Sequence, residues 1–400
     1  MRQIEPREVA MNRNDDPSSY LIDAARGLAP KISAAGEWIE QERRLPDDIV
    51  EVLKEAGLFR MNVPRSLGGA EASLSTFAQV IEEVAKADAS TAWCLSQNGG
   101  ICRVAAYLPR AGAEEIFGQP DLTIGWGNGP ASAVKVDGGY RLTGRWGFAS
   151  GIRHAKWLGC QDCPILDAEG QPVIDDNGAP EKRIFFFPTA DVTIQDVWQV
   201  SGLKGTGSES YSVTDLFVPA QRSPTPGSEP SEPGTLYRFN TTQIFSCGFA
   251  SVGLGLARAS LDAFIDLSVT KTPRGISGVL REMGTVQVHI AKAEATLRSA
   301  RSFLHETIDN AWRAAEETGA VSVETRILLR LATTHALECA AKVVDTAYYN
   351  AGVTAIFNAN GFERRFRDMH AATQHIQARE DHYEPVGQFF LGLEPSLVWL

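Results

Sequence analysis

The chain has 400 residues, of which 44% are hydrophobic and 22% are charged, and its formal net charge is −11. This composition is that of a folded globular protein, and it excludes a disordered or collagen-like chain. Lysine and arginine form no dense block, so no nucleic-acid partner is expected. At about 100–200 residues per domain, the length predicts two or three domains.

The sequence predicts a cytoplasmic protein without a membrane partner. Its polar N-terminal segment lacks the apolar core of a signal peptide, and no apolar run reaches the length of a membrane helix. The six cysteines are sparse for this length and are expected to be reduced. Cys160 and Cys163 form a CxxC pair, but no second pair follows at zinc-finger spacing. We therefore interpret the pair as structural and expect no metal site.

Residues 18–120 predict an N-terminal helical domain. Apolar residues recur at helical spacing over residues 18–45, 45–59 and 73–87. Pro46, followed by two aspartates, is typical of a helix start, and Gly57 is placed to end that helix. Residues 93–117 predict a more buried helical segment, interrupted near Pro109.

Residues 121–222 predict a middle β-domain. Residues 133–136 and 140–142 flank an Asp-Gly-Gly turn, which indicates a β-hairpin. Further strands are expected at residues 157–159, 183–187, 192–195 and 211–218. Short strands separated by turn residues are typical of a small barrel or sandwich. The proline-rich residues 221–235 then predict a connector.

Residues 236–400 predict a C-terminal helical bundle. Between Gly284 and Gly319 there is neither glycine nor proline, and apolar residues step by three and four along one face. Residues 324–349 repeat this pattern and are rich in alanine, which lets helices approach closely. The chain is therefore expected to be mainly α-helical with a central β-domain, and the apolar stripes indicate self-association.

This three-part order resembles the acyl-CoA dehydrogenase superfamily. Matching motifs occur at Met61–Gly69, at Gly202–Ser208 followed by Asp215–Pro219, and in the alanine-rich C-terminal helices. The resemblance spans residues 20–375 and implies an N-terminal helical domain, a middle β-barrel and a C-terminal four-helix bundle.

Within that superfamily, the chain is similar to the two-component flavin monooxygenases, which include hydroxyphenylacetate, hydroxylated-steroid and dibenzothiophene oxygenases. The similarity lies in residues 144–151 with His154 and Trp157, in residues 272–275, and in residues 366–370 with His375. It implies an oxidoreductase that takes reduced FMN or FAD from a separate reductase and uses molecular oxygen through a flavin hydroperoxide. The substrate would be a small aromatic or heteroaromatic molecule, and the assembly a homotetramer.

The resemblance also implies the catalytic residues. Ser150 would face flavin N5, where its hydroxyl can form a hydrogen bond; the alternative is a turn serine that bonds its own backbone. His375 would act as the acid or base. His370, five residues earlier, is a candidate substrate contact together with Trp93, and which histidine faces the flavin stays open because residues five apart share no helical face.

The remaining candidates would bind the flavin itself. Trp146 and Phe148 would form aromatic walls, with plain core residues as the alternative. Arg274 would reach the flavin phosphate, often across a subunit boundary, unless it is an exposed loop arginine. Thr206 and Ser208 would offer hydroxyls and backbone amides, or else belong to a simple glycine turn.

Two departures from the family pattern bear on the alternatives. Residues 372–377 lack the glutamate that dehydrogenases carry in a Tyr-Glu-Gly-Thr context, and Glu380 and Glu384 lie on a tail expected to be solvated. Ile101 stands where some family monooxygenases have histidine. Arg367 and Asp368 are expected to form a structural ion pair. The alternative functions are an FAD-containing acyl-CoA dehydrogenase or related flavin oxidase, and a helical scaffold that has lost its flavin.

Overall fold

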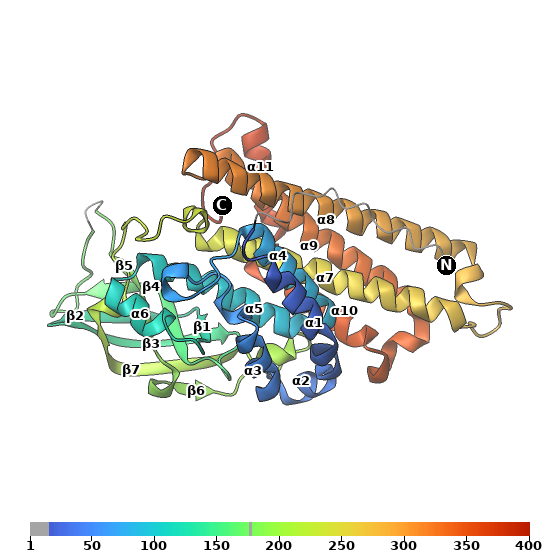
Figure 1. Ribbon diagram of the computed structural model, residues 1–400, viewed down its shortest axis with the longest axis horizontal. Coiled ribbons are helices and arrows are strands. Elements are labelled where there is room, and N and C mark those ends of the chain that lie inside the picture. Colours follow the sequence, from blue (N-terminus) through green and yellow to red (C-terminus); the bar gives the residue numbers. More distant parts are fainter. Residues whose placement is uncertain (1–15, 176–177) are drawn as a thin grey trace.

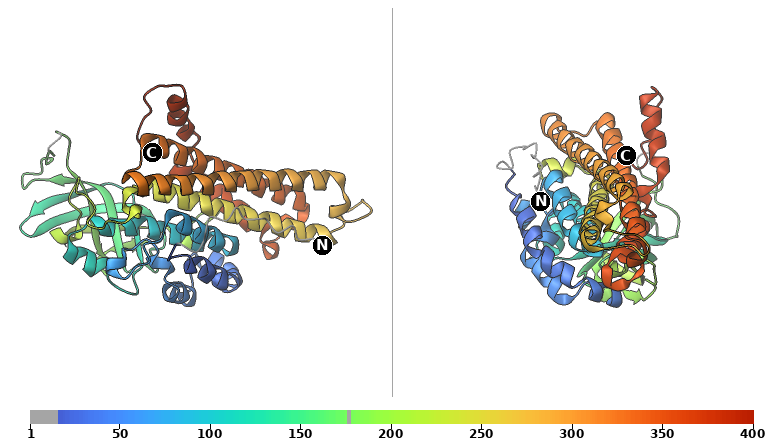
Figure 2. Two further views of the ribbon diagram at one scale, coloured as in Figure 1. Left: turned by 45° about the horizontal axis from the view of Figure 1, so that its top comes forward. Right: turned by 90° about the vertical axis from the view of Figure 1, so that its right-hand side faces the viewer.

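The computed structural model describes residues 16–175 and 178–400. A sheet lies at one end of the molecule, and three long helices extend away from it side by side (Figure 1; Figure 2, left). These are α7 (Thr241–Thr270), α8 (Gly284–Thr318) and α9 (Val323–Ala351). The shorter N-terminal helices pack below them, beside the sheet (Figure 1).

The N-terminal region is helical, as predicted, but it is divided more finely. The helices are α1 (Tyr20–Ala34), α2 (Gly36–Glu42), α3 (Asp47–Glu55), α4 (Leu74–Ala87), α5 (Ala89–Cys102) and α6 (Arg110–Phe117). Gly57 has a φ of 75° just after α3, which is the left-handed geometry expected at that position. Asp88 separates α4 from α5, and its carboxylate caps α5 by accepting from the Thr91 N–H at 2.7 Å.

The middle region forms one curled sheet. Its strands are β1 (Ile124–Gly127), β2 (Ala131–Val136), β3 (Gly139–Ala149), β4 (Trp157–Leu166), β5 (Lys182–Pro188), β6 (Thr193–Gln195) and β7 (Glu209–Pro219). The predicted hairpin is confirmed as β2 and β3, whereas β1 was not predicted. Within the described residues the path runs β1-β4-β2-β3-β7-β6 with β5 beside β4, and Asn128, just after β1, exchanges two backbone hydrogen bonds of 3.0 Å with Gly147 of β3. The sheet is therefore curled back on itself, and the barrel stays a prediction.

A bulge near the end of β3 determines which side chains of residues 144–151 are buried and which are exposed. Trp146 pairs with Tyr211 and Ala149 with Glu209, so an extra residue is inserted into β3 between them. Phe148 takes a φ of 61° there. Trp146 and Phe148 would share one face of a regular strand, but the bulge separates them: Trp146 is 1% exposed and Phe148 is 69% exposed.

The C-terminal region is built on α7. This helix is long and apolar enough to cross a membrane by length and composition, but most of it is buried among the other helices, as in a core helix. The predicted stripe on α8 is buried from Val286 to Ala315, which confirms the helical face read from the sequence. The shorter helices α10 (Phe362–Ala372) and α11 (Tyr383–Phe390) follow α9.

Candidate active site

The indole of Trp93 joins residues from three distant parts of the chain. Trp93 lies on α5, and its Nε1–H donates to the hydroxyl of Ser150 at 3.2 Å. The ring of His375 meets the same indole edge-on, with 5.2 Å between the ring centroids. Ser150 and His375 are therefore separated by a single side chain, although they are 225 positions apart in the sequence.

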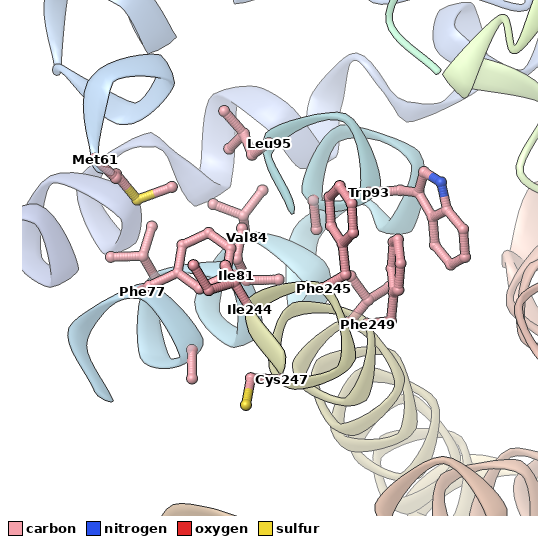
Figure 3. Packing of buried hydrophobic residues seen from close by; sticks show 14 of the residues in the cluster. Met61, Phe77, Ile81, Val84, Trp93, Leu95, Ile244, Phe245, Cys247 and Phe249 are labelled. Atoms are coloured by element: carbon pink, nitrogen blue, oxygen red, sulfur yellow. The ribbon is translucent and has the colours of Figure 1, made fainter. Parts of the chain in front are cut away.

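Further aromatic rings enclose this junction. Phe249 of α7 stacks on Trp93 at a centroid distance of 4.3 Å and lies 4.4 Å from the ring of His375. Phe245, one turn earlier on α7, stacks on Phe249 and meets Trp126 of β1 edge-on. Figure 3 shows Phe245, Phe249 and Trp93 gathered between α7 and α5. Phe249 packs directly on both Trp93 and His375, so water is excluded from the contacts between these rings.

The sequence analysis missed Trp126, Phe245 and Phe249. The two phenylalanines lie four residues apart, which places them on one helical face, but nothing in the sequence distinguishes them from other core residues of α7. Trp126 lies on a strand of only four residues, all buried, so no alternation marked it.

His375 reaches the junction because α10 ends before it. The helix stops at Ala372, and the Nδ1 atom of His375 accepts a hydrogen bond from the Gln377 N–H at 3.2 Å. An accepting Nδ1 carries no proton, so the proton of the neutral ring lies on Nε2. Burial among aromatic rings lowers the pKa of His375 to about 4, which keeps the ring neutral near pH 7.

His370 lies elsewhere. Its Nε2 is 2.8 Å from the Asp345 carboxylate of α9, and its ring packs on Phe366 at 4.3 Å. Of the two histidines left open by the sequence, His375 is the one beside Trp93. The helix end between them resolves the geometric conflict, because the two residues do not share a helix.

A series of buried hydroxyls continues from Ser150. Its Oγ lies 2.7 Å from that of Ser208, and Ser208 lies 2.7 Å from the hydroxyl of Thr206. Thr206 in turn donates to the Leu203 carbonyl oxygen at 2.8 Å. All three hydroxyl residues are at least 95% buried. Ser150 is therefore not a turn serine that bonds only its own backbone.

The loop that carries Thr206 and Ser208 is held by α10. Asp368 accepts the Leu203 N–H at 2.6 Å, and Leu203 itself has a left-handed φ of 52°. Gly202 is required because a Cβ there would overlap the backbone oxygen of Arg367. Burial raises the pKa of Asp368 to about 7, with the nearby Asp88 carboxylate acting in the same direction.

The predicted ion pair between Arg367 and Asp368 is wrong. Arg367 instead contacts Glu40 at 2.8 Å and Glu363 at 2.6 Å, and it also donates to the Ser201 carbonyl. Adjacent residues on a helix point about 100° apart, so the arginine faces α2 while the aspartate faces the Leu203 backbone. Both residues hold the same loop, from different sides.

Three of the predicted flavin contacts lie apart from the junction. Trp146 is a core residue of the sheet, stacked on Tyr211 at 5.1 Å, because of the bulge in β3. Phe148 lies on the surface, edge-on to Trp198 at 6.1 Å. Arg274 is exposed in the loop after α7. At about 1.5 Å per residue, the end of α7 lies roughly 30 Å along the helix from Phe249, so Arg274 is far from the junction in this chain.

The CxxC pair has the geometry expected of a structural feature. Cys160 and Cys163 are both buried in the sheet core at a second irregularity, in β4. Burial raises the pKa of the Cys160 thiol well above its ordinary value, so this thiol is unreactive. In the part of the chain that the structure describes, no group of three or more histidine, cysteine, aspartate or glutamate side chains could hold a metal ion.

Comparisons with known proteins agree with this architecture. The family model for the acyl-CoA dehydrogenase N-terminal domain matches residues 20–116, and that for the C-terminal domain matches residues 247–380. An indole-3-acetate monooxygenase of Pseudomonas putida is 32% identical over 94% of this chain and 93% of its own length. The oxygenase component of an FADH(2)-dependent resorcinol hydroxylase from Rhizobium sp. is 28% identical over 95% of this chain and 96% of its own length.

The solved structures show the same relationship. The crystal structure of a 3-HSA hydroxylase from Rhodococcus sp. RHA1 superposes with a TM-score of 0.85 at 27% identity, covering 95% of this chain and 99% of that one. These matches extend over nearly the full length of both partners. The chain therefore belongs to the acyl-CoA dehydrogenase superfamily, among its two-component flavin-dependent monooxygenases.

Proposed function

We propose that this chain is the oxygenase component of a two-component system, which hydroxylates a small aromatic or heteroaromatic molecule with reduced flavin and molecular oxygen. A separate reductase would supply reduced FMN or FAD. The observation that carries the proposal is the junction at Trp93, where the Ser150 hydroxyl and the neutral His375 imidazole meet one indole inside a layer of aromatic rings.

The residues present fit a flavin. The hydroxyls of Ser150, Ser208 and Thr206 are uncharged and buried, which suits a ring system with few polar atoms and does not suit an ion. Phe148 adds an exposed flat apolar surface two residues before Ser150. When bound, reduced flavin supplies the electrons with which molecular oxygen is activated.

The residues of this chain would then have distinct tasks. Trp93, Phe245 and Phe249 exclude water from the reacting atoms. Ser150 fixes the orientation of the flavin edge through its hydroxyl. His375 can donate a hydrogen bond from Nε2 to an oxygen atom, and its low pKa keeps it from introducing a charge among the apolar rings.

The enclosure also supports an aromatic substrate. Its rings are Trp93, Trp126, Phe245 and Phe249. An electron-rich ring of the kind named for the relatives, an indole or a resorcinol, would stack on such walls.

Isotope labelling tests the proposed function. The purified chain is mixed with chemically reduced FMN, ¹⁸O₂ and a substrate panel that includes indole-3-acetate and resorcinol. We expect a product that carries one labelled oxygen atom. Ser150→Ala should lower product and raise hydrogen peroxide per flavin oxidised, while Ser299→Ala on the exposed face of α8 should change neither. Hydrogen peroxide as the sole product across the panel would contradict the proposal.

The acyl-CoA dehydrogenase alternative lacks support at the site. Proton removal from a thioester requires a carboxylate beside the flavin. Glu380 and Glu384 are both exposed, and Glu384 is bonded to Gln388 on the surface of α11. The sequence offered these two glutamates as the candidates for that base.

We also propose a homotetramer with three domains per chain, at residues 18–120, 121–222 and 236–400. Support comes from the end of the bundle that carries Arg274. Lys271 bonds Thr354 there at 2.5 Å, which places the Arg274 loop beside the exposed apolar side chains of Val353 and Ile356. A second copy packed on this surface would bring Arg274 to a flavin phosphate. Light scattering measures the mass of the assembly, which should be that of four chains. Arg274→Gln should weaken FMN binding and leave this mass unchanged.

A further inference from the structure

The hydroxyls beyond Ser150 form a chain whose two ends are chemically different. At one end, the indole N–H of Trp93 points at Ser150 Oγ, and an indole nitrogen can only donate. At the other end, the Thr206 hydroxyl lies 2.8 Å from the Leu203 carbonyl oxygen, and a carbonyl can only accept. Ser150, Ser208 and Thr206 lie between, linked by two contacts of 2.7 Å in which either oxygen could be the donor.

These ends fix the direction of every bond between them. Thr206 has one hydroxyl proton and gives it to the Leu203 carbonyl, so its oxygen must accept from Ser208. Ser208 therefore donates its own proton to Thr206, and its oxygen must accept from Ser150. Each hydroxyl donates once and accepts once, and the direction runs from Trp93 through Ser150, Ser208 and Thr206 to Leu203.

The opposite direction would leave one donor unpaired and would place two acceptors in contact. If Thr206 donated to Ser208 and Ser208 to Ser150, the proton of Ser150 would have no acceptor among the described residues. The Thr206 and Leu203 oxygens would also face each other at 2.8 Å without a proton between them. Leaving a buried donor unpaired and two acceptors in contact is unfavourable, so the first direction prevails.

The direction of the hydrogen bonds along these hydroxyls restricts what Ser150 can offer to a ligand. Its proton is committed to Ser208, and one lone pair accepts from Trp93. What remains is a second lone pair, which can bind only an atom that carries a proton. N5 of a reduced flavin carries a proton, whereas N5 of an oxidised flavin carries only a lone pair.

We propose that Thr206 is a positioning residue that makes Ser150 an obligate hydrogen-bond acceptor, so that this site selects reduced over oxidised flavin. The inference rests on the proposed function, because it requires that a flavin binds beside Ser150. Through these contacts Thr206, which lies three hydrogen bonds away from the ligand and out of contact with it, would influence which redox state is held.

The Leu203 carbonyl, which accepts the last hydrogen bond of the series, is held firmly in place. The Leu203 backbone is held by Asp368 at 2.6 Å, and its carbonyl also accepts from the Trp198 Nε1–H at 3.1 Å and from the Thr206 N–H at 3.2 Å. The carbonyl therefore keeps two donors if the Thr206 hydroxyl is removed. A substitution at Thr206 can change the polarity of the chain without leaving this carbonyl unpaired.

The test compares Thr206→Val, which has nearly the same shape but no hydroxyl, with Thr206→Ser, which keeps it. Affinities for FMN and FAD are measured anaerobically by titration, each in the oxidised and dithionite-reduced state. In Thr206→Val, Ser208 loses its acceptor and can donate to Ser150, which frees the Ser150 proton for an unprotonated nitrogen. We expect the preference for reduced flavin to fall by about tenfold, as for one hydrogen bond reversed in a buried site.

Thr206→Ser should keep the preference of the unaltered chain within about threefold. Ser208→Ala removes the acceptor of the Ser150 proton directly, and it should also lower the preference, which keeps the test open if Thr206→Val fails to fold. An unchanged preference in Thr206→Val or Ser208→Ala would overturn this inference alone. If the unaltered chain binds neither redox state of FMN or FAD, the proposed function fails, and the inference fails with it.

Discussion

Asp368 is a buried carboxyl whose ionisation opposes folding. Burial, with a smaller contribution from the Asp88 carboxylate, raises its pKa from 3.8 to about 7. At about 1.36 kcal/mol per pKa unit, the ionised form costs the folded state up to about 4 kcal/mol. Because the folded pKa lies above the unfolded one, stability is greatest at pH values below the unfolded pKa and is lost as the pH rises from about 4 to about 7.

The substitution Asp368→Asn removes this charge and keeps the bond to Leu203. The amide oxygen of asparagine can accept the Leu203 N–H, which Asp368 Oδ1 now accepts at 2.6 Å. We therefore expect Asp368→Asn to be more stable than the unaltered chain at about pH 8, by a few kcal/mol. Near the acid end of this range the two proteins should differ little, because the aspartic acid is then protonated as well.

Thermal unfolding followed by circular dichroism at a series of pH values measures the difference. The melting temperature of Asp368→Asn minus that of the unaltered chain should be small at about pH 4, should increase up to about pH 7, and should level off above that. Asp23→Asn, on the exposed surface of α1, serves as a control that should show no such increase. A melting temperature for Asp368→Asn below that of the unaltered chain at pH 8 would refute the reasoning.

Three other predictions follow from the same structure. Burial raises the pKa of Glu82, but its contacts with His305 and Arg301 of α8 lower this pKa to about 2. Glu82→Gln should lower stability by about 3 kcal/mol at neutral pH, and less as the pH falls below about 4, in urea unfolding. Gly202→Ala should destabilise by about 1–3 kcal/mol in the same assay because the new methyl group meets the Arg367 backbone; an unchanged midpoint would contradict the packing. The ring of His375 should stay neutral, with its proton on Nε2, from about pH 5.5 to 8 in ¹H–¹⁵N correlation spectra, and a midpoint near 6.5 would disprove its enclosure.

The elements of the fold could be predicted from the sequence because they depend on local pattern. The β2–β3 hairpin follows from its glycine turn, and the long helix α8 from an apolar stripe between Gly284 and Gly319. The strand β1 was missed because it is short and fully buried, and its partner β4 lies about 30 residues away in the sequence. Pairing of that kind is decided by the sheet, not by the segment itself.

The sequence by itself determined the residue types at the site: a serine after a strand, a histidine after a helix, and a loop rich in glycine and hydroxyls. Only the tertiary structure decided which of them meet. A bulge placed Trp146 in the core and Phe148 at the surface, and the end of α10 brought His375, not His370, to Trp93. The physical reason is that hydrogen-bond direction and ring contacts depend on residues that are far apart in the chain. A local sequence pattern does not specify which of those residues become neighbours.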